Sequence, residues 1–206
     1  PHSMAATYRS RPIQELLISN LYGYYSYYSR RPGKLFEGAD QCLCIFLGNR
    51  KNDNNEFWNA SSGYQRWYTE ERSTLFQEIE YLVKTDTNGW REYGVLPKIG
   101  TEVEASIISR LIAFRRLSET LFAHGQEFYC HRIARYFIKS TDFIPYFRSE
   151  RDGIKRSDDF KVYCAPNKQL ALLIVALLNS NLFYWFWRTL FDGYHCGKEN
   201  IASFPF

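Results

Sequence analysis

The sequence lacks the short motifs with which proteins hold nucleotides and metal ions. It contains no Gly-x-Gly-x-x-Gly segment and no Walker-type loop, so it has no glycine-rich turn to hold a phosphate. It contains no Cys-x-x-Cys pair with zinc spacing, and no clustered carboxylates that resemble the metal site of a nuclease. We therefore expect a chain that carries no cofactor and no metal, and that does not catalyse a reaction by itself.

A disulfide framework is not expected either. The five cysteines, at positions 42, 44, 130, 164 and 196, are odd in number and indicate reduced side chains in a cytoplasmic protein. The pairs Cys130-His131 and His195-Cys196 would form a metal or nucleophile site only if they met in space. Adjacent cysteine and histidine residues are an unusual ligand spacing, so this alternative is not favoured.

No segment predicts secretion or a membrane span. Residues 1–4 resemble a vector remnant, and this abrupt start indicates an excised fragment of a longer protein. Residues 170–187 form a long apolar run, but Asn179, Ser180 and Asn181 lie near its centre. Consecutive polar residues are costly in lipid, so we expect a buried helix and no membrane contact.

The composition is that of a globular protein rich in aromatic residues. Hydrophobic residues make up 45% of the 206 residues and charged residues 23%, which is ordinary for a chain with a sizeable core. Aromatic residues reach 18%. They fill cores, and they also offer flat faces on which nucleic-acid bases stack. The net charge of +4 permits an anionic partner without requiring one. The positions of the charges along the chain therefore have to indicate whether such a partner is expected.

The hydrophobic pattern predicts an α+β fold of mixed short strands with three or four helices. Thr101 and Glu104 have the spacing of a capping box, which predicts a helix that continues to a stop at Gly125. The other expected elements are a helix over residues 13–21, strands over 22–28 and 42–47 with the second ending at Gly48, a polar boundary over 49–55, a helix from Thr69 to about Lys84, a loop containing Asn88-Gly89, strands and loops over 127–162, and one helix over 167–191.

A basic stretch rich in aromatic residues lies between His131 and Arg156. It contains seven cations against three carboxylates, with five aromatic side chains interleaved. Phosphate contacts need mobile surface cations, and base edges are read by polar side chains on a rigid scaffold. The other interpretation is a solvated face on which arginines pair with nearby carboxylates. The seven cations are Arg132, Arg135, Lys139, Arg148, Arg151, Lys155 and Arg156.

A second candidate cluster follows the last predicted helix, over residues 192–200. Its glycines allow the backbone to approach a ligand closely. Three of its side chains, His195, Lys198 and Asn200, are able to donate hydrogen bonds to phosphates or bases.

Several segments of the chain occur in the order found in one known family. They are residues 28–41 (YSRRPGKLFEGADQ), which precede an apolar strand, residues 98–100 (KIG), residues 131–137 (HRIARYF), residues 177–186 (LLNSNLFYWF), and the segment from Asp192-Gly193 to Phe204-Pro205. Together they resemble the adenine-specific DNA methyltransferases of bacterial restriction-modification systems, of the type II or fused restriction-methylase kind. The resemblance covers the stretch after the catalytic motif and the target-recognition region.

The resemblance implies how the chain divides into domains and which step of DNA methylation it serves. After the vector remnant at residues 1–4, residues 5–55 would be the tail of the methyltransferase sheet and residues 56–206 the target-recognition domain. The family's glycine-rich motif for S-adenosylmethionine and its Asn-Pro-Pro-Tyr catalytic motif are absent. They are expected upstream, so S-adenosylmethionine is implied for the parent protein only. This fragment would hold the DNA while the missing catalytic domain flips out and methylates an adenine.

The leading hypothesis is a module that binds double-stranded DNA through the seven cations together with His195, Lys198 and Asn200. The first alternative is a protein-interaction domain whose exposed aromatic residues dock a restriction-modification partner, such as a nuclease domain or subunit. The second is a free-standing nuclease.

Overall fold

The computed structural model describes residues 2–7, 10–51, 58–84 and 96–206. These residues have the α+β fold that the sequence predicts. They form four helices of ten or eleven residues, two helices of about one turn, and strands in three sheets. The chain divides into two units, and each is described by itself. The first unit contains Pro1–Ile112 and Arg188–Asp192, and the second contains Ala113–Trp187 and Gly193–Phe206.

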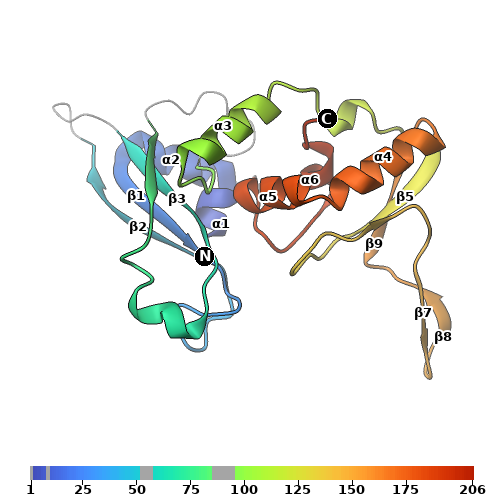
Figure 1. The fold of residues 1–206 in the computed structure, drawn as a ribbon, viewed down its shortest axis with the longest axis horizontal. Coiled ribbons are helices and arrows are strands. Elements are labelled where there is room, and N and C mark those ends of the chain that lie inside the picture. The colour runs from blue at the N-terminus through green and yellow to red at the C-terminus, as the bar shows by residue number, and fades with distance from the viewer. Residues whose placement is uncertain (1, 8–9, 52–57, 85–95) are drawn as a thin grey trace. The chain divides into compact units, whose positions relative to one another are not determined.

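The first unit is built around a four-stranded sheet with the order β2-β1-β3-β4 (Figure 1). β1 pairs antiparallel with β2 and parallel with β3, and β3 pairs antiparallel with β4. The helix and the strand expected near residues 13–28 are both confirmed. The elements of this unit are α1 (Ser3–Ala6), α2 (Arg11–Asn20), β1 (Leu21–Tyr28), β2 (Leu43–Arg50), β3 (Asn59–Gln65), the 3-10 helix η2 (Thr69–Ser73), β4 (Tyr81–Lys84) and α3 (Glu102–Leu111).

The tyrosine-rich strand β1 supplies much of the core of this unit. Tyr25 and Tyr27 are fully buried and pack with Leu96, while Tyr28 packs in a second cluster with Trp67. The Tyr27 hydroxyl donates a hydrogen bond to the carbonyl of Leu96 at 3.2 Å, so its polar end is satisfied inside the core. Aromatic residues favour strands because their large side chains pack well on a pleated surface, and this is how they are used here.

Strand β2 departs from the expected buried strand that ends at Gly48. It runs through Gly48 to Arg50, and its first half is only partly buried while its second half is exposed. Gly48 is needed inside the strand, because it lies opposite Gly23 of β1. A Cβ atom on Gly48 would lie 2.1 Å from the carbonyl oxygen of Tyr22, so the close approach of the two strands requires glycine here.

Replacing Gly23 by alanine should destabilise the first unit. Gly23 has a φ of +149°, and an added Cβ atom would lie 2.3 Å from the carbonyl oxygen of Leu47. We expect Gly23→Ala to lower the free energy of unfolding by at least about 1 kcal/mol, measured by urea denaturation. Gly63→Ala is the matched control, because its nearest neighbour would be a Glu104 side-chain oxygen at 3.5 Å. Equal stability of the two variants would contradict the prediction.

The helix expected from Thr69 to about Lys84 is wrong. The chain forms only the 3-10 helix η2 at Thr69–Ser73 and then enters β4 at Tyr81–Lys84. Strand β4 pairs with β3 in a register that places Leu82 opposite Ser61. The apolar residues at helical spacing are instead explained by the second core cluster, which Leu75 and Ile79 join. Pairing with a strand distant in sequence overrides the local helical pattern. The predicted Asn88-Gly89 loop lies outside the described residues.

The start of the helix expected after Thr101 is confirmed. The helix itself is shorter than expected. The Thr101 hydroxyl accepts a hydrogen bond from the Glu104 backbone N–H at 3.2 Å, and the Glu104 carboxylate accepts one from the Gly100 N–H at 2.9 Å. Helix α3 ends at Leu111, well before Gly125. The predicted stop was wrong because the later apolar residues belong to other elements, including Leu117, which opens the 3-10 helix η3 (Leu117–Glu119) of the second unit.

A lysine lies fully buried inside the first unit. The Lys98 ammonium donates a hydrogen bond to the carbonyl of Phe191 at 2.7 Å and lies 5.9 Å from the centre of the Tyr27 ring. Burial lowers the pKa of Lys98 to about 7, with Asp192 acting in the opposite direction. The resemblance singled out the KIG segment without predicting this environment.

The second unit has a three-stranded antiparallel sheet with the order β6-β5-β9, a separate hairpin β7-β8, and helix α4 in contact with all three strands of the sheet. Strands and loops over residues 127–162 are thus confirmed. The elements are β5 (Gln126–His131), β6 (Ser140–Thr141), β7 (Tyr146–Ser149), β8 (Gly153–Arg156), β9 (Phe160–Ala165), α4 (Lys168–Leu178), α5 (Asn181–Leu190) and α6 (Lys198–Ala202). The last turn of α5 is counted with the first unit.

The single helix expected over residues 167–191 is two helices. α4 and α5 are separated at Asn179 and Ser180 and are bent by 63°. In the described part of the chain, no single helix is long and apolar enough to cross a membrane, although this bent pair reaches the required length and composition when taken together. The Asn179 side chain explains the break, because it hydrogen-bonds to the backbone of Ser140 in both directions.

The predicted boundary at residues 55/56 does not coincide with a boundary between the two compact units. Strand β3, which follows it, joins the same sheet as β1 and β2. At the N-terminus, His2 is 2% exposed and donates its backbone N–H to the carbonyl of Cys42 at 3.0 Å. The assignment of residues 5–55 to a methyltransferase sheet and of residues 56–206 to a recognition domain stays a prediction.

Candidate nucleic-acid interface

All ten residues predicted to bind DNA belong to the second unit. They fall into three groups according to the elements that carry them. The first is the hairpin β7-β8 and its turn, the second is the segment between β5 and β6, and the third is the C-terminal segment. The groups are Arg148, Arg151, Lys155 and Arg156; Arg132, Arg135 and Lys139; and His195, Lys198 and Asn200.

The second and third groups are adjacent although they are distant in sequence. Ile133 and His195 form an isolated antiparallel β-bridge. The Ala134 N–H donates to the carbonyl of Tyr194 at 3.0 Å, and the Cys196 N–H donates to the carbonyl of Arg132 at 2.7 Å. The two clusters that the sequence offered separately therefore lie on neighbouring segments of the second unit.

The hairpin β7-β8 is the most exposed secondary structure of the second unit. Figure 1 shows it projecting beyond the end of strands β5 and β9. Every residue of β8 is exposed, and so are the first three of β7. At the turn, Ser149 and Asp152 hydrogen-bond to each other, and Gly153 has a φ of +68°. This arrangement is a two-stranded ribbon that is open to solvent on both faces.

The hairpin carries four cations against two carboxylates. Arg148 lies opposite Ile154, and Phe147 lies opposite Lys155, so the cations point to both faces of the ribbon. Among the described residues, no carboxylate lies within ion-pair distance of Arg148, Arg151 or Lys155. The alternative of a face whose arginines are neutralised by neighbouring carboxylates therefore does not describe the hairpin.

Arg156, at the end of β8 nearest the three-stranded sheet (the foot of the hairpin), contacts strand β5. Its guanidinium lies 5.5 Å from the centre of the Tyr129 ring, a cation–π contact. Tyr129 is almost fully buried, and its hydroxyl donates a hydrogen bond to Glu127. Burial and this carboxylate raise the pKa of Tyr129 to about 12, so the phenol stays neutral. Arg156 therefore has a positioning role in addition to any contact with a ligand.

In the second group, Arg132 is held by a carboxylate whereas Arg135 is exposed. The Arg132 Nε donates to the Asp159 carboxylate at 2.7 Å, and this hydrogen bond lowers the pKa of Asp159. Arg135 lines a cavity of about 350 Å³ with Lys139 and Tyr136. Arg132 fits the alternative of a paired surface cation, and Arg135 fits an open one.

In the third group, the Asn200 side-chain oxygen accepts a hydrogen bond from the Gly197 N–H at 2.7 Å and closes the start of α6. Its role is at least partly structural. His195 and Lys198 are exposed, and the His195 carbonyl accepts a hydrogen bond from the buried Trp187 indole at 2.9 Å.

The Cys-His pairs weighed as a metal site do come near each other, through the same bridge. Cys130 and Cys196 are both fully buried. Within residues 2–7, 10–51, 58–84 and 96–206, no group of three or more histidine, cysteine, aspartate or glutamate side chains is arranged to hold a metal ion.

Known proteins offer no guide to this surface. No protein-family model, no curated protein and no solved structure matches the chain. The interpretation of the surface therefore depends on its own geometry.

Sequence reasoning missed three residues that contact the predicted cations or line the cavities beside them. They are Tyr129, Phe160 and Asn179, and none stands out in the sequence. Phe160 is one of many aromatic residues. Asn179 is visible only as a polar residue inside an apolar run, and its partner Ser140 is distant in sequence.

Proposed function

We propose that the second unit binds double-stranded DNA, as the target-recognition part of an adenine-specific methyltransferase of a restriction-modification system. The observation that carries the proposal is the exposed ribbon β7-β8, with Arg148, Arg151 and Lys155 free of carboxylate partners among the described residues. The major groove of B-DNA admits a two-stranded ribbon, and guanidinium groups bind both phosphates and guanine edges.

The adjacent surface supports the same proposal. Arg135, Lys139 and Lys198 are exposed on the segments that the Ile133–His195 bridge brings together. Cations spread over one surface increase affinity for a polyanion, because each neutralised phosphate releases condensed counterions. Exposed aromatic side chains such as Tyr136 and Phe137 lie between the cations on these segments.

The methyltransferase context comes from the resemblance of the sequence. In this proposal the chain finds and holds the DNA. The parent protein supplies the S-adenosylmethionine site and the catalytic motif that this sequence lacks. The partners are double-stranded DNA, the catalytic domain and a nuclease domain or subunit.

A second candidate is a protein-docking domain, and the exposed apolar residues of the hairpin favour it. Tyr146 is 65% exposed and Ile154 is 75% exposed. Apolar side chains on a projecting hairpin are suited to a partner protein as well as to DNA. Dependence on salt separates the two candidates, because phosphate binding weakens steeply with ionic strength and apolar docking does not.

The test is a fluorescence-anisotropy titration of the chain with random-sequence duplex DNA at about 50 mM and about 200 mM salt. Four phosphate contacts would lower the affinity by about 100-fold over this range. A control with S-adenosylmethionine should show no binding to this chain. Absence of DNA binding at the lower salt concentration would contradict the proposal and favour the docking domain.

A charge reversal at Arg135 tests the DNA contact more directly than a charge reversal at Arg132. Arg132→Glu would place a carboxylate beside Asp159 and disturb the fold locally. Arg135 lies on the same surface and is exposed. Weakened DNA binding by Arg135→Glu, with unchanged thermal unfolding, is the expected result, and unchanged affinity would count against this part of the surface.

A further inference from the structure

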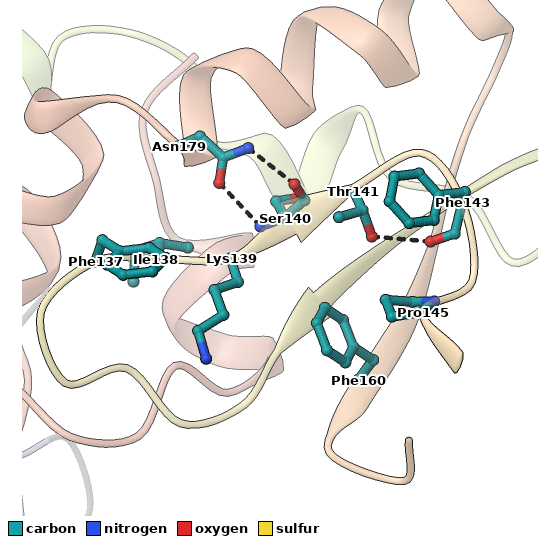
Figure 2. A pocket seen from close by; sticks show the side chains of 9 residues that line it. All are labelled: Phe137, Ile138, Lys139, Ser140, Thr141, Phe143, Pro145, Phe160 and Asn179. Carbon is teal, nitrogen blue, oxygen red and sulfur yellow. Dashed lines mark hydrogen bonds between the residues drawn. The ribbon is translucent and has the colours of Figure 1, made fainter. Parts of the chain in front are cut away.

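A mostly apolar cavity lies at the foot of the hairpin. It has a volume of about 520 Å³, within the range of small-molecule sites. Pro145, which directly precedes β7, forms part of its wall, and Lys139 and Phe137 also line the smaller cavity beside Arg135. Figure 2 shows the lining residues, which are Phe137, Ile138, Lys139, Ser140, Thr141, Phe143, Pro145, Phe160 and Asn179.

We infer that this cavity receives one unpaired base of a bound DNA strand and holds it by stacking, without reading which base it is. The inference rests on the proposed function and deepens it, because it adds a nucleotide subsite to the surface that binds the duplex.

The aromatic side chains give the cavity its preference for a flat ring. Phe137 and Phe143 are each 61% exposed, and Phe160 is partly buried on the strand β9. Aromatic side chains left this exposed at a cavity present their faces to a ligand. Bases stack on aromatic rings regardless of sequence, since every base has a π face. In a paired duplex those faces are covered by neighbouring bases, so the ligand has to be an unpaired base.

Three polar side chains of the cavity, those of Asn179, Ser140 and Thr141, already make hydrogen bonds within the protein. The Asn179 amide accepts from the Ser140 N–H at 2.9 Å and donates to its carbonyl at 2.8 Å. The Thr141 hydroxyl donates to the carbonyl of Phe143 at 2.8 Å (Figure 2). The Ser140 hydroxyl donates to the carbonyl of Tyr129. These bonds hold the walls in place and engage each of the three side chains at least once. The rest of the lining is mostly apolar, so stacking contributes more to the contact than reading of a base edge does.

Lys139 selects a nucleotide over a neutral aromatic molecule. Its side chain is exposed, and its ammonium lies 5.7 Å from the centre of the Phe137 ring, at the margin of the cavity. A base stacked in the cavity carries a phosphate on each side, and a cation at the margin complements that charge. Arg135 in the adjoining cavity adds a second cation for the same strand.

The test compares two duplexes of the same sequence, one fully paired and one with a single unpaired thymidine, by fluorescence anisotropy with the whole chain. We expect the duplex with the unpaired thymidine to bind about tenfold more tightly. Phe143→Ala should reduce this ratio to near one and leave the affinity for the paired duplex unchanged. Phe122→Ala is the matched control, because Phe122 is 57% exposed in the same unit and does not line the cavity.

The outcomes separate this inference from the proposed function. Equal affinity for the two duplexes would overturn the base-binding cavity and leave DNA binding intact, whereas no binding of either duplex would overturn both. Replacing the unpaired thymidine by each other base should change the affinity by less than about threefold. A preference of tenfold or more for one base would overturn the absence of base reading.

Discussion

Replacement of Arg148, Arg151 and Lys155 by glutamine should lower the affinity for duplex DNA by about 100-fold to 1,000-fold at about 0.1 M salt, if the proposed contacts are made to phosphates. This is the largest change that we expect from any substitution on the surface. Each phosphate contact contributes about 0.9 to the slope of affinity against salt concentration on logarithmic axes, so the triple variant should lower that slope by about 2.7. The three side chains are exposed and have no carboxylate partners among the described residues, so the fold should be unaffected.

The measurement is the same anisotropy titration, repeated at several salt concentrations. The matched control removes three exposed cations from the first unit, with Lys34, Arg50 and Arg110 changed to glutamine. It has the same net charge as the hairpin variant, so it removes the effect of overall charge. Similar losses in the two variants would show that the attraction to DNA is general and that the hairpin has no special part in it.

The fold should become more stable between pH 7 and pH 9, by about 2 kcal/mol. The cause is Lys98, whose pKa is about 7 in the folded chain and 10.5 as its ordinary value. Between these two values the unfolded chain binds more protons than the folded chain, so stability rises with pH. The window ends near pH 9 because burial also raises the pKa of Cys44 from 9.0 to about 12, which lowers stability at higher pH.

Urea denaturation of Lys98→Met at the two pH values checks this prediction. The variant should lose the increase, whatever its absolute stability, because methionine has no proton to release. Lys168→Met is the control, since Lys168 is exposed and its replacement should retain the increase. His2 contributes little to the change in the free energy of unfolding over this range. Burial lowers its pKa to about 3, so the folded chain keeps it neutral between pH 7 and pH 9. An increase that persists in Lys98→Met would contradict the assignment.

The sequence predicted those elements whose signals are local. The run of tyrosines predicted the strand β1, and the spacing of Thr101 and Glu104 predicted the start of α3. The basic stretch rich in aromatic residues was found in full, because charge and ring content are visible without a structure. The same region was predicted as strands and loops, but the pairing of β7 with β8 was not identified, although the turn between Ser149 and Gly153 is local.

The errors arose where distant residues decide the outcome. Residues 69–84 have helical periodicity, but pairing with β3 makes Tyr81–Lys84 a strand. The apolar run after Asn167 was correctly expected to be helical, yet it breaks at Asn179 because that side chain binds Ser140. The bridge between Ile133 and His195, which unites two candidate clusters, has no signature in either segment.

That bridge also affects the order in which the protein matures on the ribosome. The loop after β5 is synthesised early, but the Ala134 N–H and the Arg132 carbonyl are bonded to Tyr194 and Cys196, which are made near the end of the described chain. The strands of the hairpin β7-β8 have their pairing partners close by in sequence, and their pairing uses no residue made after Arg156. The segments that carry Arg135 and Lys198 therefore come together only after the C-terminal segment has been made, later than the residues of the hairpin.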